Sequence, residues 1–337
     1  MRTIAPSRLA NLALLASLVL GLTLGAGAAA AGPLADLLKG TALDDGSDAS
    51  GSASLPAGVT VQRDIAYGAD PNQRYDIYLP SHFDVRRSPV IVMVHGGGWK
   101  RGDKGASNVV KNKAARWVPK GAVFVSINYR LLPGTDPLHQ ADDVAKAIAH
   151  VQTKALTYGA DGNKVILMGH SAGAHLAALV NADPSRVTNI GGKTWLGTIA
   201  LDSAALDVPA VMNRRHLPLY DAAFGANPNY WYQTSPIHGL GAKSLPLLAV
   251  CSTQRPDQPC DQAKAFAARA KGLGVTAGVR EEALSHSEIN DKLGLPGAYT
   301  DAVEAFMIKL DPGFAARLGK AGAATESKKP AADDDRG

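Results

Sequence analysis

Short apolar runs alternate along the chain with stretches in which apolar residues recur at every third or fourth position. Runs typical of strands cover 59–67, 75–79, 89–95, 122–128, 164–168, 195–201, 245–251 and 275–284. Helical spacing marks 140–158, 172–181, 261–271 and 299–310. Strands that alternate with helices predict an α/β fold whose mostly parallel central sheet is covered on both sides.

One segment, 203–243, breaks this alternation and is rich in aromatic residues among prolines and glycines. We expect it to form a small insertion over the edge of the sheet, where a pocket could form. The residues that could line an acyl or aryl pocket, or equally belong to the core, are Trp99, Tyr220, Phe224 and Trp231.

The two ends of the chain differ in composition from its middle. Arg2 and Arg8 precede an apolar run that gives way to small residues at 26–31, a pattern typical of a secretory signal peptide over 1–31. A retained membrane anchor is the alternative. We expect a flexible lead-in at 32–58, one folded domain at 59–311 and a disordered tail at 312–337. The prediction is an exported protein, periplasmic or secreted, without stable membrane insertion after cleavage.

The overall composition of the 337 residues is that of a globular protein, with 46% hydrophobic and 19% charged residues. The formal net charge of +5 comes without a run of five Lys or Arg, which argues against a nucleic-acid partner. Cys251 and Cys260 are the two cysteines, and export predicts a disulfide between them worth roughly 2–3 kcal/mol. No Cys/His cluster has zinc spacing, so no metal site is predicted.

A glycine-flanked serine follows the apolar run 164–168 directly, in the stretch Gly169-His170-Ser171-Ala172-Gly173. At a sharp strand-to-helix corner, flanking glycines remove side chains that would collide with the neighbouring elements. The serine hydroxyl is then lifted to the carboxyl edge of the sheet, where ligands bind in such folds. This context predicts that Ser171 is a catalytic nucleophile; a tight turn with a buried serine is the alternative.

A second glycine-rich stretch, His95-Gly96-Gly97-Gly98-Trp99, also ends a buried strand. Acyl transfer builds negative charge on the carbonyl oxygen, and each backbone N–H aimed at that oxygen is worth roughly 3–4 kcal/mol. We therefore expect the N–H groups of Gly97, Gly98 and Ala172 to form an oxyanion hole. The stretch lacks the Lys-Ser/Thr ending and the Gly-x-Gly-x-x-Gly spacing of phosphate-binding loops.

Taken together, these motifs resemble the α/β-hydrolase superfamily, and most closely its carboxylesterase, feruloyl-esterase-like and arylformamidase-like branch. The stretches that carry the resemblance are 75–80, 95–99, 128–131, 169–173 and 285–290. The likeness spans about 59–311 and implies the α/β-hydrolase fold for that range. It also implies a serine nucleophile, a histidine base, an acid between them in the chain, and no cofactor.

The base is expected after Ser171, because the family order is serine, acid, histidine. His286 follows the last predicted strand in a Ser-His-Ser loop before a helix, where the family places its base. The other histidines after the serine are His175 on the following helix, and His216 and His238 in the aromatic insertion.

The acid is expected after the strand 245–251, where many relatives carry Gly-x-x-Asp. This chain reads Ser-Thr-Gln-Arg-Pro-Asp from 252 to 257, so the aspartate is displaced by two residues and Arg255 takes its usual place. Asp257 is the acid that the resemblance favours. Asp261, at the start of the next helix, is the alternative and is also explained as a helix-capping residue.

The function predicted from these residues is an exported serine carboxylesterase that cleaves short-acyl or aryl esters through an acyl-enzyme. The partner would be a small-molecule ester. An amidase or arylformamidase is the alternative within the hydrolases, since the same residues cleave amides if they can protonate a worse leaving group. A catalytically inactive fold used for binding is the alternative of another class. The sequence indicates neither the natural substrate nor the oligomeric state.

Overall fold

The computed structural model describes residues 57–81 and 87–318. The signal peptide predicted for 1–31, almost all of the lead-in and the chain beyond 318 lie outside these residues. Within the described ranges, no helix combines the length and apolar character needed to cross a membrane.

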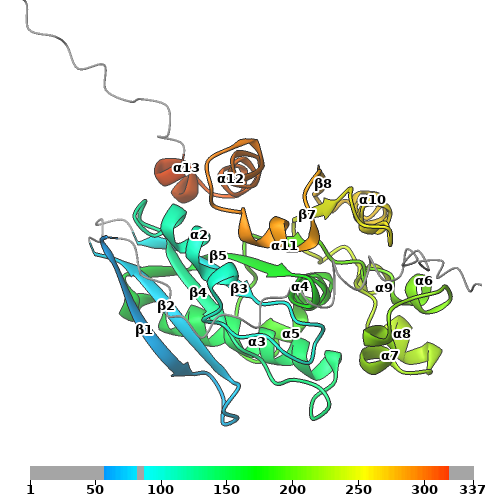
Figure 1. Ribbon diagram of the computed structural model, residues 1–337. Helices are drawn as coiled ribbons and strands as arrows, with labels where there is room; N and C mark the ends of the chain where they lie inside the picture. Colours follow the sequence, from blue (N-terminus) through cyan, green and yellow to red (C-terminus); the bar gives the residue numbers. More distant parts are fainter. Residues whose placement is uncertain (1–56, 82–86, 319–337) are drawn as a thin grey trace, which may run out of the picture.

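Eight strands form one sheet in the order β1-β2-β4-β3-β5-β6-β7-β8 (Figure 1). Their bounds are β1 Val59–Ala66, β2 Arg74–Pro80, β3 Ser88–Val94, β4 Val123–Ile127, β5 Ala160–His170, β6 Gly197–Leu201, β7 Leu247–Ser252 and β8 Ala277–Glu282. β2 pairs antiparallel with β1 and β4, and every other pairing in the sheet is parallel. The mostly parallel sheet predicted from the alternating pattern is confirmed.

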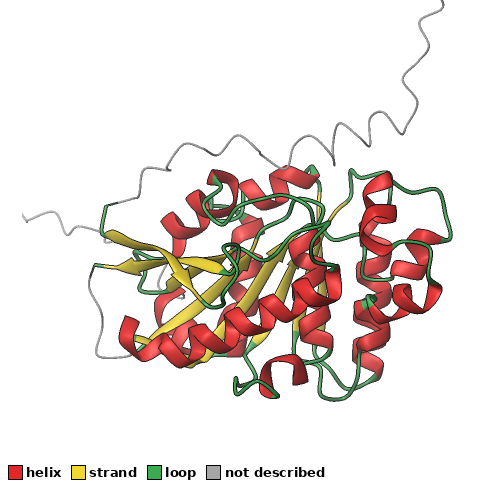
Figure 2. Cartoon of the chain, turned by 90° about the horizontal axis from the view of Figure 1, so that it is seen from below, coloured by secondary structure: helices red, strands yellow, loops and turns green. Residues whose placement is uncertain are grey.

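Helices cover both faces of this sheet (Figures 1 and 2). One face carries α3 Pro137–Lys154, α4 Ala172–Ala182, α5 Ser185–Thr188 and α10 Pro259–Gly272, with a short 3₁₀ turn, Ala155–Tyr158, after α3. The other face carries α2 Ser107–Trp117, α11 His286–Asp291, α12 Ala298–Leu310 and α13 Pro312–Leu318. The connection through α2 therefore passes over one face, and the connections through α3, α4 and α10 pass over the other, so that both faces are covered.

The central strand β3 shows why its sequence is apolar at successive positions. Val90, Val92 and Val94 pack on the face covered by α3 and α4. Ile91 and Met93 point to the opposite face, which α2 and α12 cover. Because side chains alternate along a strand, a strand covered on both faces has to be apolar throughout.

The segment 203–243 forms four short helices that stand beside the carboxyl ends of the strands (Figure 1). They are α6 Val208–Met212, α7 Pro218–Phe224, α8 Pro228–Gln233 and α9 Pro236–Gly239. A proline opens α7, α8 and α9, where its missing N–H costs nothing. The expected aromatic insertion is therefore present, and it is helical.

The helices that the pattern did not predict include α2 and α13. The buried face of α2 includes Lys113, so the apolar spacing of that helix is incomplete. α13 extends the folded domain past the predicted boundary at residue 311, because Phe314 and Leu318 are buried in the core that α12 also joins. The prediction of a disordered tail is thus wrong for 312–318, and the rest of the predicted tail lies outside the described residues.

Candidate active site

The serine motif forms the sharp corner between β5 and α4. Ser171 has φ 55° and ψ −119°, a conformation that is strained for a non-glycine residue. A Cβ on Gly169 would collide with the backbone of Gly173, and a Cβ on Gly173 would collide with the carbonyl of His95. The two glycines are thus required by close backbone approach, and the corner projects the Ser171 side chain into a cavity.

The His286 side chain, from α11, contacts the hydroxyl of Ser171. Its Nε2 lies 2.9 Å from Ser171 Oγ, although the two residues are 115 positions apart in the chain. His286 is the first residue of α11, which begins with a capping box between Ser285 and Glu288. The His286 carbonyl lies 3.0 Å from His170 Nε2, which ties this helix to β5. The structure thus brings together the predicted nucleophile and the predicted base.

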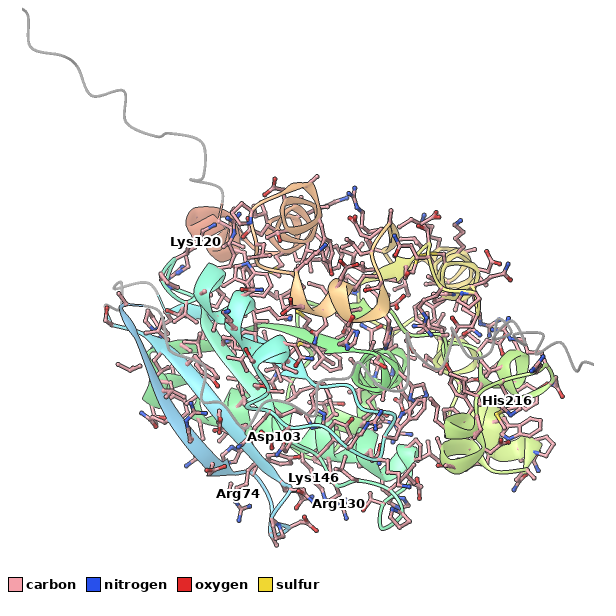
Figure 3. All side chains as sticks on the ribbon, viewed as in Figure 1. Arg74, Asp103, Lys120, Arg130, Lys146 and His216 are labelled. Atoms are coloured by element: carbon pink, nitrogen blue, oxygen red, sulfur yellow. A yellow bond between two sulfur atoms is a disulfide. The ribbon has the colours of Figure 1, made fainter. Side chains whose placement is uncertain are left out.

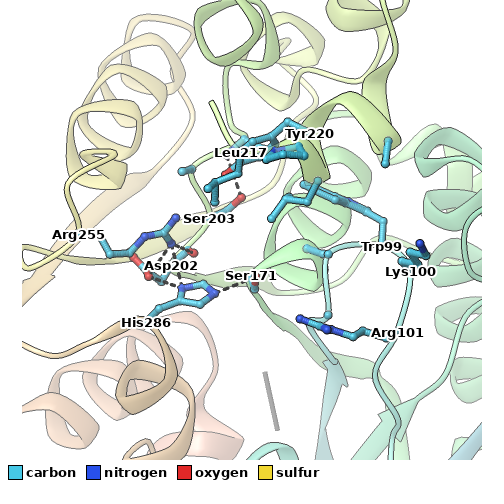
Figure 4. Close-up of a pocket in the computed structure, with 18 residues that line it drawn as sticks. Trp99, Lys100, Arg101, Ser171, Asp202, Ser203, Leu217, Tyr220, Arg255 and His286 are labelled. Carbon is cyan, nitrogen blue, oxygen red and sulfur yellow. Dashed lines mark hydrogen bonds and ion pairs between the residues drawn. The ribbon is translucent and has the colours of Figure 1, made fainter. Parts of the chain in front are cut away.

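The acid on His286 is Asp202, a residue that the sequence analysis did not single out. Asp202 Oδ2 lies 2.6 Å from His286 Nδ1 (Figure 4). The Oδ1 of Asp202 accepts a hydrogen bond of 2.7 Å from the backbone N–H of Ser252. β6 lies next to β5, and Leu201 is in register with His170. The residue that follows Leu201 therefore lies beside the serine corner.

The expectation that Asp257 supplies this acid is wrong. Both of its carboxylate oxygens accept hydrogen bonds from the Arg255 guanidinium, which stands between Asp257 and Asp202. Asp261, the alternative, lies exposed in the first turn of α10. The physical reason is the sheet order: the loop after β7 starts one strand farther from β5 than the end of β6 does.

Asp202 is ionised in this setting. Burial by itself raises the pKa of a carboxyl group, but the charge of Arg255 and the hydrogen bond with His286 hold the pKa of Asp202 well below its usual range. A buried carboxylate on Nδ1 favours the tautomer in which Nδ1 carries the proton and Nε2 is free to accept one. That tautomer lets His286 take the proton of the Ser171 hydroxyl.

Three backbone groups predicted for an oxyanion hole come together at the same cavity. Gly97, Gly98 and Ala172 all line it beside Ser171. Ala172 is the first residue of α4, where a helical N–H has no partner within its own helix. Such N–H groups can stabilise negative charge that develops on an oxygen bound next to the serine.

The cavity measures about 340 Å³ and is mostly apolar (Figure 4). Trp99 and Tyr220 line it, together with Leu217, Pro218 and Leu219 around the start of α7. Of the four aromatic residues predicted for a pocket, these two are wall residues. Phe224 packs behind Trp99 with ring centroids 5.0 Å apart, and Trp231 donates to the carbonyl of Gly225 away from the cavity.

The other histidines have partners of their own. His175 is fully buried, accepts a hydrogen bond of 3.1 Å from Trp99 Nε1, and lies 2.7 Å from the Thr234 carbonyl. Burial lowers the pKa of His175 to about 4, so it stays neutral and orients Trp99. His216 lies on the insertion (Figure 3). Its Nε2 is 3.0 Å from Asp221 Oδ1, and His238 lies on α9.

The two cysteines form the expected disulfide, Cys251–Cys260. Cys251 lies in β7 and Cys260 in α10, so the bond closes the loop that carries Arg255 and Asp257.

Asp202 and Arg255 could both have been identified from the chain. Asp202 lies between Ser171 and His286 in the sequence and follows an apolar strand directly, so it satisfies the required order. Arg255 occupies the place where relatives carry the acid, which already indicates that the carboxylate comes from elsewhere. The prediction of Asp257 instead followed the usual position of the acid in the family, after the strand 245–251.

Comparisons with known proteins find esterases among the similar sequences. The isoprenylcysteine alpha-carbonyl methylesterase ICME of Arabidopsis thaliana is 36% identical over 118 residues, which are 35% of this chain and 27% of ICME. Esterase LipC of Mycobacterium tuberculosis is 25% identical over 250 residues, which are 70% of this chain and 59% of LipC. The chain thus spans less than two thirds of the length of either relative.

A solved structure and a family model complete the comparison. Esterase B from Lactobacillus Rhamnosis superposes with a TM-score of 0.63 at 18% identity, covering 78% of this chain and 88% of that one. At this identity the likeness shows the fold alone, and it confirms the fold class predicted from the motifs. The model of the BD-FAE family matches residues 75–269. Because that match spans more than half of the sequence, the chain belongs to the BD-FAE family and has the α/β-hydrolase fold.

Proposed function

We propose that this protein is a serine carboxylesterase that uses Ser171, His286 and Asp202 to cleave short-acyl or aryl esters. The observation that carries the proposal is the continuous chain from Ser171 Oγ through the His286 ring to Asp202, with contacts of 2.9 and 2.6 Å, at the wall of an apolar cavity. Relatives named as esterases support the same activity.

Acylation follows from the positions of these groups. Ser171 Oγ attacks the ester carbonyl carbon while its proton passes to His286 Nε2, and the carbonyl oxygen becomes an oxyanion. The N–H groups of Gly97, Gly98 and Ala172 stabilise that oxyanion. When the tetrahedral intermediate collapses, the bond to the alcohol oxygen breaks and the imidazolium of His286 protonates the leaving alcohol. Asp202 stabilises the imidazolium and stays ionised throughout.

Deacylation repeats these steps with water as the nucleophile. His286 Nε2 takes a proton from a water molecule, whose oxygen attacks the acyl carbon. Collapse then releases the carboxylic acid and returns the proton to Ser171 Oγ. The serine hydroxyl and the neutral histidine are thereby restored, so the cycle needs no group beyond the residues that line the cavity.

The shape of the cavity supports the substrate class. A volume of about 340 Å³ lies at the lower end of the range for small-molecule sites, and its walls are largely aliphatic and aromatic. Trp99 and Tyr220 offer flat apolar surfaces suited to an aryl ring or a short acyl chain. A long acyl chain would extend beyond this space.

Export is part of the proposal. It is supported by the signal-peptide pattern at 1–31 and by the Cys251–Cys260 disulfide, because disulfides persist in oxidising compartments. The N-terminal residue of the protein recovered from the periplasm or medium of a bacterial host tests this part. A first residue near position 32 supports export, and full-length protein confined to the cytoplasm contradicts it.

The activity is tested with a p-nitrophenyl ester series from acetate to palmitate, plus an aryl ester and an anilide, for wild type and Ser171→Ala. We expect turnover of short and aryl esters that falls by about 10⁴-fold or more in Ser171→Ala. Turnover of the anilide with none of the esters would move the assignment to an amidase. A folded wild type that turns over none of these substrates, and whose Ser171 does not react with a phosphonate probe, would indicate a binding role.

A further inference from the structure

The loop after β7 places a buried arginine against the acid and the histidine of the site (Figure 4). The side chain of Arg255 is 7% exposed and lies between Asp202, at 0%, and Asp257, at 14%. Its Nε donates 2.9 Å to Asp257 Oδ1, and its Nη2 donates to Asp257 Oδ2. Asp257, Arg255, Asp202 and His286 thus form a row of neighbouring charged and ionisable groups.

Arg255 Nη1 contacts both Asp202 and His286, and the number of its hydrogens decides which of these contacts are hydrogen bonds. Nη1 lies 2.8 Å from Asp202 Oδ2, 3.0 Å from the Asp202 carbonyl and 2.9 Å from His286 Nδ1. An Nη1 carries two hydrogens, and the two Asp202 oxygens accept both. When His286 Nδ1 donates its own proton to Asp202, its approach to Nη1 is a contact between two donors. Arg255 therefore fixes the carboxylate and also places a positive charge next to the imidazole.

We propose that Arg255 is a positioning residue for the Ser171–His286–Asp202 unit, which holds the Asp202 carboxylate against His286 and sets the pH at which His286 can take the serine proton. This inference rests on the proposed function. Asp257 moderates the effect, because its carboxylate offsets part of the guanidinium charge. Without Asp257, the cation would disfavour the imidazolium more strongly; without Arg255, the unshielded Asp202 would favour it.

Other titratable groups lie close to His286, to the Arg255–Asp202 pair or on the neighbouring elements, and they are the same in every variant used below. They are His170 on β5, Lys113 on α2, Tyr220 on α7, Glu282 on β8, Tyr299 on α12, and Glu288 and Asp291 on α11 itself. Because none of them changes between variants, their contributions cancel when pH profiles are compared.

The test is the pH profile of kcat/KM on a p-nitrophenyl ester for wild type, Arg255→Gln, Arg255→Lys and Asp257→Asn. We expect the acid limb to move up by about one pH unit or more in Arg255→Gln, because a positive charge is lost beside His286. In Asp257→Asn it should move down, and by less, because this carboxylate acts from beyond the guanidinium. Arg255→Lys loses the two-nitrogen contact with Asp257 but keeps a positive charge, so its limb should lie closer to wild type than that of Arg255→Gln.

Shifts of the acid limb in opposite directions in Arg255→Gln and Asp257→Asn would distinguish an effect of charge on His286 from a merely structural role of Arg255. A limb that stays in place in Arg255→Gln while kcat falls would overturn the inference, as would movement in the same direction in Arg255→Gln and Asp257→Asn. If Arg255→Gln does not fold, an unmoved limb in Asp257→Asn overturns it. An active wild type with unmoved limbs leaves the proposed function standing, whereas a wild type inactive on every ester overturns the function and this inference together.

Discussion

The carboxyl ends of β6 and β7 each carry an aspartate, and the two are held in different ways. Asp202 follows β6 without an intervening residue, is fully buried, and receives donors from Ser252, Arg255 and His286. Asp257 stands five residues beyond the last residue of β7, is partly exposed, and has both of its oxygens bound by Arg255. The first carboxylate therefore binds the histidine, while the second binds the arginine.

The difference shows that donors and strand neighbours decide which carboxylate serves the histidine. Any strand whose end lies at the same edge of a parallel sheet can present an acid there. β6 is the immediate neighbour of β5, so an aspartate directly after it needs no loop to reach the site. An acid after β7 needs a loop of the right length, and here Arg255 fills that place.

The largest expected effect comes from neutralising the two aspartates separately. Asp202→Asn should lower kcat by about 10⁴-fold, because an amide on Nδ1 no longer favours the tautomer that accepts the serine proton. Asp257→Asn is the matched control and should lower kcat at pH 8 by less than about 10-fold. Steady-state kinetics on p-nitrophenyl acetate measure both. Equal losses of kcat in the two variants would contradict the conclusion that Asp202, and not Asp257, is the carboxylate that serves His286.

A smaller effect is expected when the loop after β7 loses its covalent closure. Cys251→Ser/Cys260→Ser should lower the free energy of unfolding by roughly 2–3 kcal/mol, because the unfolded chain is no longer constrained. The end of β6 does not depend on this bond, so Asp202 should still support turnover. Urea unfolding measures the change, with wild type in reductant as the matched condition. An unchanged unfolding midpoint would show that the disulfide does not hold this part of the fold.

A further effect concerns how α2 holds α11, the helix that begins with His286, on the face of the sheet that both helices cover. Lys113 on α2 is buried and donates to the carbonyls of Asn290 and Asn108, which ties α2 to the end of α11. Burial lowers the pKa of Lys113 from 10.5 to about 7. The unfolded state therefore binds more protons than the folded state between these values, and stability should rise with pH across about 7 to 10.5.

Lys113→Met removes this contribution. The variant should gain stability relative to wild type as the pH falls from about 10 to 7, and urea unfolding at pH 7 and 9.5 measures the difference. If the free energies of unfolding of wild type and variant change in parallel between these two pH values, Lys113 is not the source of the pH dependence. Turnover at pH 8 reports whether α11 still presents His286.

Much of the fold and part of the site could be predicted from the sequence, for physical reasons. The run of apolar residues at 89–95 had to be a strand buried on both faces, and Gly169 and Gly173 allow the corner that carries Ser171. His286 was found because it follows the last strand, where the resemblance to the α/β-hydrolases places the base.

Other features depend on contacts between distant segments and leave no local pattern. The buried face of α2 includes a lysine whose partner carbonyl lies 177 residues away in the chain. Asp202 satisfies the required order along the chain but has no motif around it, and its register beside Ser171 and the Ser252 N–H distinguish it from other aspartates. Arg255 was visible as a departure from the family pattern, but only the structure shows that it separates the two aspartates.

The central claim is that Ser171 is activated through His286 by Asp202. The most direct measurement is the rate at which a fluorophosphonate labels Ser171 at pH 8, followed by intact mass and peptide mapping, in wild type, Asp202→Asn and Asp257→Asn. The account predicts a single label on Ser171 at similar rates in wild type and Asp257→Asn, and labelling slower by about 100-fold or more in Asp202→Asn. Labelling of Asp202→Asn at the wild-type rate, or a label on any other residue, would contradict it.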